Sequence, residues 1–164
     1  PYHIYINMEK ATFGGGCFWG VEAAYRKVKG VLSTSVGYMG GHFENPCHLD
    51  VVSRITGHAE VAQIEYDPDI VNYEELLDIF WNIHDPTSLN RQGADRGEQY
   101  RSVIFYHTTH QEAIARNSKQ SLQSSGKFEK AIITDIKPAS AYWLASDEHQ
   151  QYFEKARCNN KNNY

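Results

Sequence analysis

One cysteine stands in a sequence context that is typical of a reactive thiol. Three glycines at positions 14–16 come directly before Cys17, and the aromatic residues Phe18 and Trp19 come directly after it. The glycines permit backbone dihedral angles that are closed to other residues, and they leave the sulfur unshielded by side chains. Two rings beside an open turn favour a small apolar pocket. We therefore predict that Cys17 is a nucleophile beside a pocket that could hold a methyl group.

The reactivity of this thiol depends on the element that follows it. If a helix begins near Cys17, the sulfur lies beside unpaired N–H groups and the positive end of the helix dipole, which favour the thiolate. An ordinary thiol, with a pKa of about 8.5, is only a few per cent ionised at pH 7, so we expect a lowered pKa. The competing interpretation is a buried and inert cysteine, the usual fate of a free cysteine. The glycine turn and the aromatic pair favour the reactive interpretation.

The other two cysteines, Cys47 and Cys158, lie far from Cys17 in the sequence. They form no Cys-x-x-Cys pair and no zinc-ligand spacing, and no histidine spacing supplies a ligand set. We therefore expect no bound metal and no disulfide framework, which agrees with a cytoplasmic location. Cysteines of this kind are either inert or reactive thiols.

The composition is that of a single folded domain over residues 1–164, with a polar tail from about residue 150. Hydrophobic residues make up 41% of the chain and charged residues 22%, and no Pro- or Ser-rich linker divides it. The net charge is −4 without a dense block of Lys or Arg, so we expect no nucleic-acid partner. Residues 1–10 lack the pattern of a signal peptide, and no run of about 18 apolar residues predicts a membrane span. Nothing demands more than a monomer.

The sequence predicts helices and strands that alternate along the chain, with Cys17 between a strand and a helix. Residues 10–16 end an extended segment, residues 19–29 have helical spacing, and residues 31–38 are rich in β-branched residues. Residues 86–99 are too polar for a core element and longer than most connections, which is typical of a functional loop. This order predicts an α+β fold, a two-layer sandwich with helices on a mixed sheet and a split βαβ (ferredoxin-like) core. The remaining predicted elements are a half-buried strand over 58–66, a helix over 73–83, a strand over 100–106, a helix over 109–124, a strand over 131–137 and a helix over 147–156.

The block around Cys17 and several later blocks resemble the type A peptide methionine sulfoxide reductases. The matching blocks, which span nearly the whole chain, are GCFWG at 16–20, GYMGG at 37–41, TGHAE at 56–60, HDPT at 84–87, NRQGADRGEQYRS at 90–102 and HQQY at 149–152. The resemblance implies an α+β enzyme that reduces the S epimer of methionine sulfoxide, free or in oxidised proteins. It also implies that no metal or cofactor is bound.

Attack by a thiolate on the sulfoxide sulfur leaves negative charge on the oxygen, so a proton donor and hydrogen bonds are needed there. The resemblance implies that Glu60 is the acid, and its apolar strand would desolvate the carboxyl and raise its pKa. Strand alternation alone favours the opposite, a Glu60 that faces solvent. The resemblance further implies that Tyr100 and Asp95 lie around the sulfoxide oxygen and an ordered water.

One block departs from the family pattern. In the family the pair Asn45-Pro46 is normally followed by Thr and then by a Tyr that also binds the sulfoxide oxygen, whereas this chain has Cys47 and His48. An imidazole can donate a hydrogen bond to the same oxygen. We therefore predict that His48 is a substrate-binding residue, and that it adds a pH dependence near its ordinary pKa of about 6.5.

After oxygen transfer Cys17 would be a sulfenic acid, which condenses with a nearby thiol to a disulfide. Cys158 lies in the tail, where many family members keep a resolving cysteine, and the resemblance implies that thioredoxin then restores both thiols. If a helix continues to Cys158, the tail must fray or bend to reach Cys17. Cys47 is the alternative resolving thiol.

Two other functions compete with this interpretation. The first is another thiol enzyme, such as a peroxide reductase, but that chemistry needs no methyl pocket and usually pairs its cysteine with a nearby cation. The second is a binding module that recognises oxidised methionine without reducing it. The presence of both Cys17 and Glu60 argues against a pure binding module.

Overall fold

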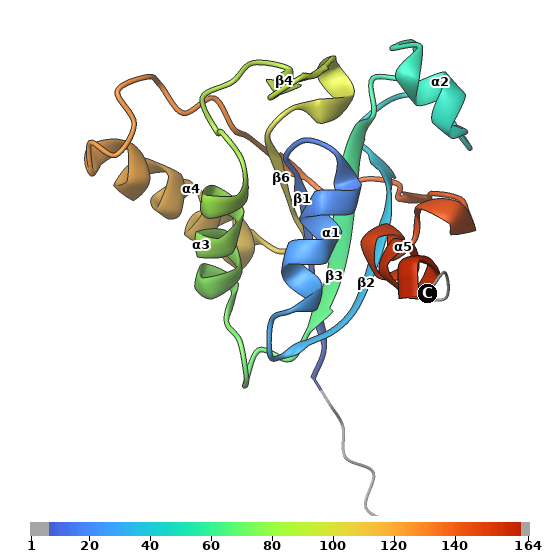
Figure 1. The fold of residues 1–164 in the computed structure, drawn as a ribbon. Helices are drawn as coiled ribbons and strands as arrows, with labels where there is room; N and C mark the ends of the chain where they lie inside the picture. The colour runs from blue at the N-terminus through green and yellow to red at the C-terminus, as the bar shows by residue number, and fades with distance from the viewer. Residues whose placement is uncertain (1–6, 162–164) are drawn as a thin grey trace, which may run out of the picture.

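The computed structural model describes residues 7–161, and a six-stranded mixed sheet forms its centre (Figure 1). The strand order is β7-β6-β1-β3-β2-β8, and neighbouring strands are antiparallel except for the parallel pair β6 and β7. The predicted α+β fold with a mixed sheet is confirmed. The strands of this sheet are β1 (Glu9–Gly14), β2 (Val31–Met39), β3 (Ala59–Tyr66), β6 (Val103–Tyr106), β7 (Asp135–Pro138) and β8 (Trp143–Leu144).

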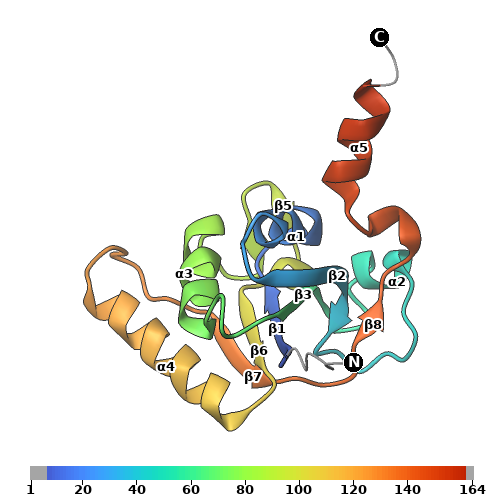
Figure 2. The same cartoon turned by 90° about the horizontal axis from the view of Figure 1, so that it is seen from below.

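Helices α1, α3 and α4 pack on one face of the sheet, and α5 projects from the body beside α1 (Figure 2). The helices are α1 (Phe18–Arg26), α2 (His48–Val52), α3 (Tyr73–Ile83), α4 (Thr109–Ser124) and α5 (Tyr152–Lys161). No helix within residues 7–161 is long and apolar enough to cross a membrane. The predictions made for residues 1–6 and 162–164 lie outside the described residues.

Strand β3 is buried on both of its faces over residues 59–62, whereas one face is partly exposed at Gln63 and Glu65. Ala62, Ile64 and Tyr66 belong to the core cluster under the helices, whereas Ala59 and Val61 belong to a smaller cluster on the opposite face. Two side chains from the segment after β7, Ala139 and Tyr142, pack against that smaller cluster. The prediction of a half-buried strand was therefore wrong over residues 59–62, because the sequence pattern did not reveal this second cover.

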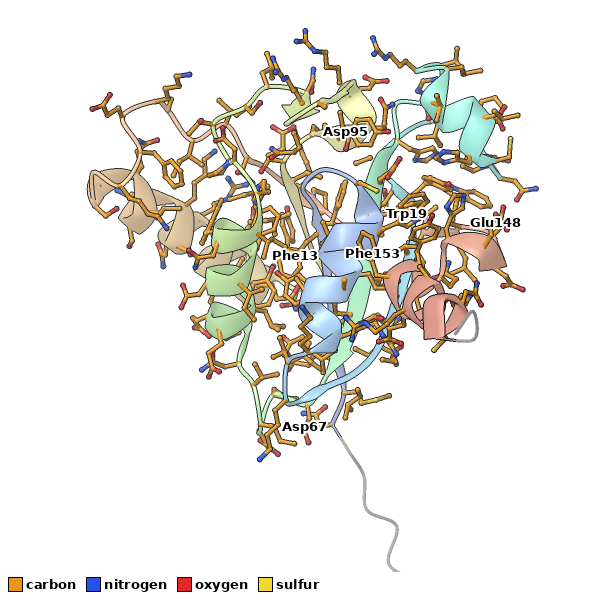
Figure 3. The ribbon with its side chains drawn as sticks, viewed as in Figure 1. Phe13, Trp19, Asp67, Asp95, Glu148 and Phe153 are labelled. Carbon is orange, nitrogen blue, oxygen red and sulfur yellow. The ribbon has the colours of Figure 1, made fainter. Side chains whose placement is uncertain are left out.

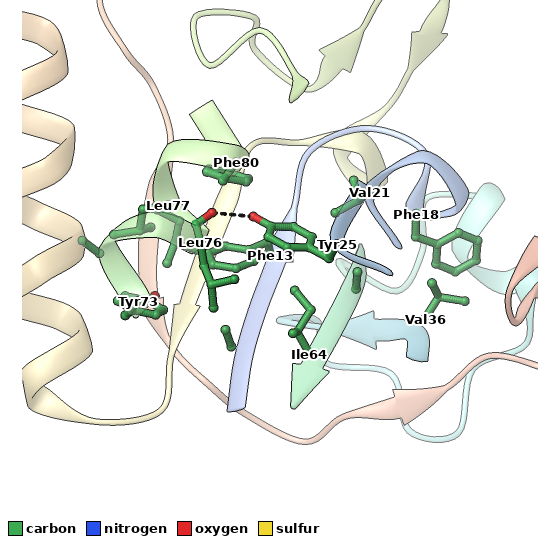
Figure 4. Close-up of a cluster of buried hydrophobic side chains, with 14 of the residues drawn as sticks. Phe13, Phe18, Val21, Tyr25, Val36, Ile64, Tyr73, Leu76, Leu77 and Phe80 are labelled. Atoms are coloured by element: carbon green, nitrogen blue, oxygen red, sulfur yellow. Dashed lines mark hydrogen bonds between the residues drawn. The ribbon is translucent and has the colours of Figure 1, made fainter. Parts of the chain in front are cut away.

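The core under the helices fixes α1 relative to β1 and α3. The Phe13 ring of β1 stacks on Tyr25 of α1 and on Phe80 of α3, with ring centroids 5.3 and 5.2 Å apart (Figure 4). The Tyr25 hydroxyl donates a hydrogen bond of 2.8 Å to the Leu76 carbonyl oxygen, which satisfies the only polar atom of that buried side chain. The position of α1, and of the turn that precedes it, is thus set by the core.

Two predicted elements end differently in the structure. Tyr100 closes a short 3₁₀ helix, η1 (Glu98–Tyr100), instead of opening a strand. The predicted helix over 147–156 is divided into η2 (Asp147–His149) and α5. The Gln150 side chain causes this division, because it bonds the backbone N–H and C=O of Val36 and the Ala145 C=O and so holds its own backbone extended.

The structure adds three features to the predicted pattern. These are the helix α2, the edge strand β8, and a small hairpin of β4 (Arg91–Gln92) and β5 (Asp95–Arg96) inside the predicted long loop. The strand predicted over 131–137 begins only at Asp135.

Candidate active site

The glycine turn between β1 and α1 is shaped by close packing. Gly16 has a φ of 91°, a region that side chains rarely adopt. A Cβ on Gly15 would lie 3.0 Å from the His84 ring, and a Cβ on Gly14 would lie 2.8 Å from a Val103 methyl. Cys17 follows as the N-cap of α1 and makes no side-chain capping hydrogen bond. The predicted turn, thiol and helix start are therefore present in that order.

Glu60 is a buried carboxyl directly below the start of α1. Strand alternation places it on the same face of β3 as Ala62 and Ile64, and it is 2% exposed. Its Oε1 atom accepts a hydrogen bond of 3.2 Å from the Phe18 N–H, one residue from the thiol. Burial raises the pKa of Glu60 to about 7, the Phe18 hydrogen bond opposes that rise, and the charge of Asp95 adds to it. The interpretation of Glu60 as a solvent-facing residue is wrong.

Cys17 has a raised pKa, so the predicted lowering was wrong. Burial raises the pKa of the thiol to about 11, and the carboxylates of Glu60 and Asp95 raise it further. Backbone hydrogen bonds from Trp19 and Gly20 lower it, as expected at a helix start, but they are outweighed. The resting residue is therefore a thiol, and a protonated Glu60 removes part of the repulsion that opposes its ionisation.

Tyr100 and Asp95 come together with these two groups. The Tyr100 carbonyl oxygen accepts a hydrogen bond of 3.2 Å from the Gly16 N–H, which ties η1 to the cysteine turn. Burial raises the pKa of Tyr100, as do the charges of Glu60, Asp95 and Cys17. Asp95 lies on the exposed hairpin strand β5, above the start of α1 in Figure 3. The charges of Glu60 and Asp95 act on both the thiol and the phenol, so the structure places these four side chains in one region.

Aromatic rings and two imidazoles form the side of the site next to α5. The Trp19 ring stacks on Tyr152 at a centroid distance of 3.7 Å, and its Nε1–H donates a hydrogen bond of 3.1 Å to His149 Nδ1. The His149 ring lies 5.4 Å from the Phe18 ring and 4.7 Å from the His48 ring. Phe18 and Trp19 are thus held rigidly beside Cys17, with His48 at the far end of the same cluster.

Sequence reasoning missed Tyr38 and His149 as residues of this site. Tyr38 is the register partner of Glu60 in the neighbouring strand, and its hydroxyl lies 3.3 Å from His48 Nδ1. His149 contacts both Trp19 and His48. Both residues stand in blocks that carry the family resemblance, which was the one available signal.

All three cysteines are free thiols. Cys47 is exposed at the N-cap of α2, where its backbone N–H donates a hydrogen bond of 2.9 Å to the Asp50 carboxylate. Cys158 is exposed on α5, a helix that continues past the predicted end and projects from the body (Figure 2). The structure does not bring Cys158 next to Cys17. Within residues 7–161, no three His, Cys, Asp or Glu side chains are grouped so that they could hold a metal ion.

Comparisons with known proteins agree with this geometry. Residues 9–164 match the model of the peptide methionine sulfoxide reductase family. The peptide methionine sulfoxide reductase MsrA 1 of Nostoc sp. (strain PCC 7120) is 72% identical over 148 residues, which cover 90% of this chain and 91% of that protein. The crystal structure of reduced Mxr1 from Saccharomyces cerevisiae has a TM-score of 0.85 at 35% identity, covering 90% of this chain and 85% of that one. A structure of Mxr1 in complex with Trx2 has a TM-score of 0.64 at 27% identity, covering 93% and 89%.

Proposed function

Since the chain belongs to the type A peptide methionine sulfoxide reductases, we propose that it reduces the S epimer, with Cys17 as nucleophile and Glu60 as general acid. The observation that carries this assignment is the 3.2 Å hydrogen bond from the Phe18 N–H to Glu60 Oε1, which holds a buried carboxyl beside the thiol. A pKa of about 7 leaves a large share of Glu60 protonated at neutral pH, as a general acid requires. The substrates are free methionine sulfoxide and oxidised proteins.

The first half of the reaction transfers the sulfoxide oxygen to Cys17. The Cys17 sulfur attacks the substrate sulfur while Glu60 gives its proton to the oxygen. This attack joins the two sulfurs; the S–S bond and the substrate S–O bond then break as the oxygen passes to the Cys17 sulfur, which leaves Cys17 as a sulfenic acid, and the thiol proton returns Glu60 to its acid form. Cys17 is oxidised by two electrons and the substrate is reduced by two, which yields methionine.

The surrounding side chains bind the two ends of the sulfoxide group. Tyr100 donates to the oxygen, which its raised pKa supports because the phenol keeps its proton at neutral pH. Asp95 acts on the same side through water, and His48 stands where the family has a tyrosine. Phe18 and Trp19 bind the methyl group, an assignment that the fixed positions of their rings support.

The second half of the reaction restores the thiol. The Cys158 sulfur attacks the Cys17 sulfenic acid, a disulfide forms and water leaves, and thioredoxin then reduces the disulfide to two thiols. The complex of the yeast relative with Trx2, a thioredoxin, supports this reductant. A disulfide needs Cα atoms about 4.4–6.8 Å apart, so α5 must unwind or swing toward the turn. Mass spectrometry after one turnover should show a Cys17–Cys158 link, whereas a Cys17–Cys47 link or a stable sulfenic acid would exclude Cys158.

A coupled assay tests this function as a whole. NADPH oxidation is followed with thioredoxin and its reductase, and the S and R sulfoxide epimers and hydrogen peroxide are supplied separately. We expect turnover with the S epimer alone, and none in the Cys17→Ser variant. Turnover of peroxide but not of the S epimer would support the peroxide reductase instead, and tight binding without turnover would support a binding module.

The cellular setting is part of the same proposal. The enzyme works in the cytoplasm, which keeps free thiols such as Cys17 reduced. It works as a monomer, since one chain supplies Cys17, Glu60 and Tyr100, whose charges act on one another. Light scattering should give the mass of one chain, and a stable dimer that loses activity on dilution would contradict this part.

A further inference from the structure

His48 and Tyr38 form a hydrogen-bonded pair between α2 and β2. The His48 Nδ1 atom lies 3.3 Å from the Tyr38 hydroxyl oxygen. Tyr38 is 1% exposed, and it stands opposite Glu60 in the register of β2 and β3. The pair therefore connects the strand next to the general acid with the first residue of α2.

The direction of this hydrogen bond fixes the position of the imidazole proton. Among the described residues, His48 Nδ1 is the one hydrogen-bond partner of the Tyr38 hydroxyl. A buried phenol needs an acceptor for its proton, and its pKa is raised by burial and by the charge of Glu60, so it remains protonated. Tyr38 is therefore the donor and His48 Nδ1 the acceptor. In a neutral imidazole the hydrogen must then be on Nε2, which faces away from Tyr38.

His149 is held in the same way from the other side. The Trp19 indole can only donate, so its contact of 3.1 Å makes His149 Nδ1 an acceptor and places the hydrogen on Nε2. The two imidazole rings are 4.7 Å apart, and two cations at that distance would repel each other. A proton on Nδ1 of either ring would also block the hydrogen bond that this nitrogen accepts. Two hydrogen-bond donors would then face each other.

The charged and titratable groups around His48 shift its pKa in both directions. Burial chiefly lowers the pKa of His48 and the charge of His149 lowers it further, whereas Glu148, the residue before His149, raises it by less. Tyr38 faces His48 from β2, and Asp50 of α2 is engaged with the backbone of Cys47. The balance lowers the pKa of His48, whereas the sequence alone predicted titration near its ordinary value.

We propose that His48 replaces the missing tyrosine as a neutral Nε2–H donor to the sulfoxide oxygen, and that Tyr38 is the positioning residue that fixes this tautomer. The inference rests on the proposed function, because it needs a sulfoxide oxygen in front of Cys17. In this proposal Tyr38 acts only by positioning His48 and does not itself contact the substrate. Any acid limb of activity that His48 causes then lies below the ordinary imidazole pKa.

Nitrogen NMR of the resting enzyme tests the tautomer without any turnover. With ¹⁵N-labelled histidine assigned by a His48→Gln variant, His48 should show a bare Nδ1 and a protonated Nε2 between pH 6 and 8. Tyr38→Phe should abolish this fixed pattern, whereas Tyr142→Phe should leave it unchanged. Tyr142 is a matched control, since its hydroxyl also makes one side-chain hydrogen bond, to Ser35, on the other face of the sheet. A protonated Nδ1 in the wild type would overturn the proposal.

First-turnover rates then test the catalytic part. Tyr38→Phe should lower the rate roughly 5- to 10-fold, the effect of one hydrogen bond, and should introduce an acid limb near pH 6.5. In a His48→Tyr background the same substitution should have almost no effect, because a phenol donor needs no tautomer. An equal loss in both backgrounds would show a merely structural Tyr38 and overturn the proposal. Absence of methionine from the wild type would instead contradict the proposed function, whatever the NMR shows.

Discussion

The two thiols of the proposed cycle lie in regions that are built in opposite ways. Cys17 follows a turn fixed by the buried core, and the carboxyl beside it is 2% exposed and hydrogen-bonded to the helix start. Cys158 is exposed on α5, whose own side chains meet α1 through the Trp19–Tyr152 stack and the exposed Arg26–Glu154 ion pair; Gln151, directly before α5, also donates to the buried Glu22 of α1. Exposed ion pairs typically contribute only about 0.2–1 kcal/mol.

The difference corresponds to the needs of the two half-reactions. Oxygen transfer needs an acid, a phenol and a sulfur in fixed positions, and the core supplies them. Disulfide formation needs one sulfur to travel to another, and a helix with few contacts can move at low cost in free energy. Variants in the two regions should therefore fail in different ways.

The largest effect separates the two cysteines. Cys17→Ser should form no methionine under any condition, because it has no nucleophilic sulfur. Cys158→Ser should form one methionine per chain at the wild-type rate and then stop when thioredoxin is the reductant. Quantifying methionine in a rapid-mixing experiment checks both. A slow first turnover in Cys158→Ser would show that the tail takes part in oxygen transfer.

Glu60→Gln should make the core more stable at alkaline pH. The folded pKa of Glu60 is raised to about 7, so the folded state holds this proton longer than the unfolded state does. The free energy of unfolding therefore falls as pH rises from the ordinary carboxyl pKa to about 7, by a total of roughly 3 kcal/mol. Gln avoids this loss, so urea unfolding should show equal stability near pH 4.5 and a more stable variant at pH 8.

Glu65→Gln is the matched control for this experiment. Glu65 lies on the same strand, and its carboxylate accepts a hydrogen bond of 3.0 Å from Ser33 at the surface. Its substitution should leave the pH dependence of unfolding close to that of the wild type. A gain at pH 8 equal to that of Glu60→Gln would mean that burial of Glu60 is not the cause.

The smallest effect on stability is expected from a substitution in α5. Glu154→Gln removes the ion pair with Arg26, whose Nε and Glu154 Oε1 are 2.6 Å apart, and should lower the free energy of unfolding by less than about 1 kcal/mol. A faster disulfide step after the sulfenic acid forms would sharpen the contrast between the regions, since a looser α5 reaches Cys17 more readily. A loss of several kcal/mol would show that α5 is part of the core.

The sequence predicted local features well and tertiary effects poorly. Helices α3 and α4 were predicted with their observed bounds, because Asn72 and Thr108 cap their starts and each accepts a hydrogen bond from a backbone N–H three residues later. The start of α1 beside Cys17 was also predicted. The sign of the pKa shift at that thiol was not, since it depends on burial and on Glu60 from a distant strand.

The same limit applies to the rest of the site. Alternation in β3 suggested an exposed Glu60, because Ala59 and Val61 looked like the core-facing residues, whereas the structure covers both faces of the strand there. The role of Tyr38 depends on its register opposite Glu60 and on a contact with α2, and the sequence predicted neither. Family resemblance supplied Glu60 and Tyr100, which physical reasoning from the sequence alone would have assigned otherwise.

The pH dependence of the first turnover tests the pairing of Cys17 with Glu60 most directly. With excess S sulfoxide and no reductant, the wild-type rate should fall as pH rises through about 7, because Glu60 loses its proton. Glu60→Gln should be roughly 10²–10⁴-fold slower and should lack this alkaline limb. The same limb in the Gln variant, or a rate close to that of the wild type, would contradict Glu60 as the acid.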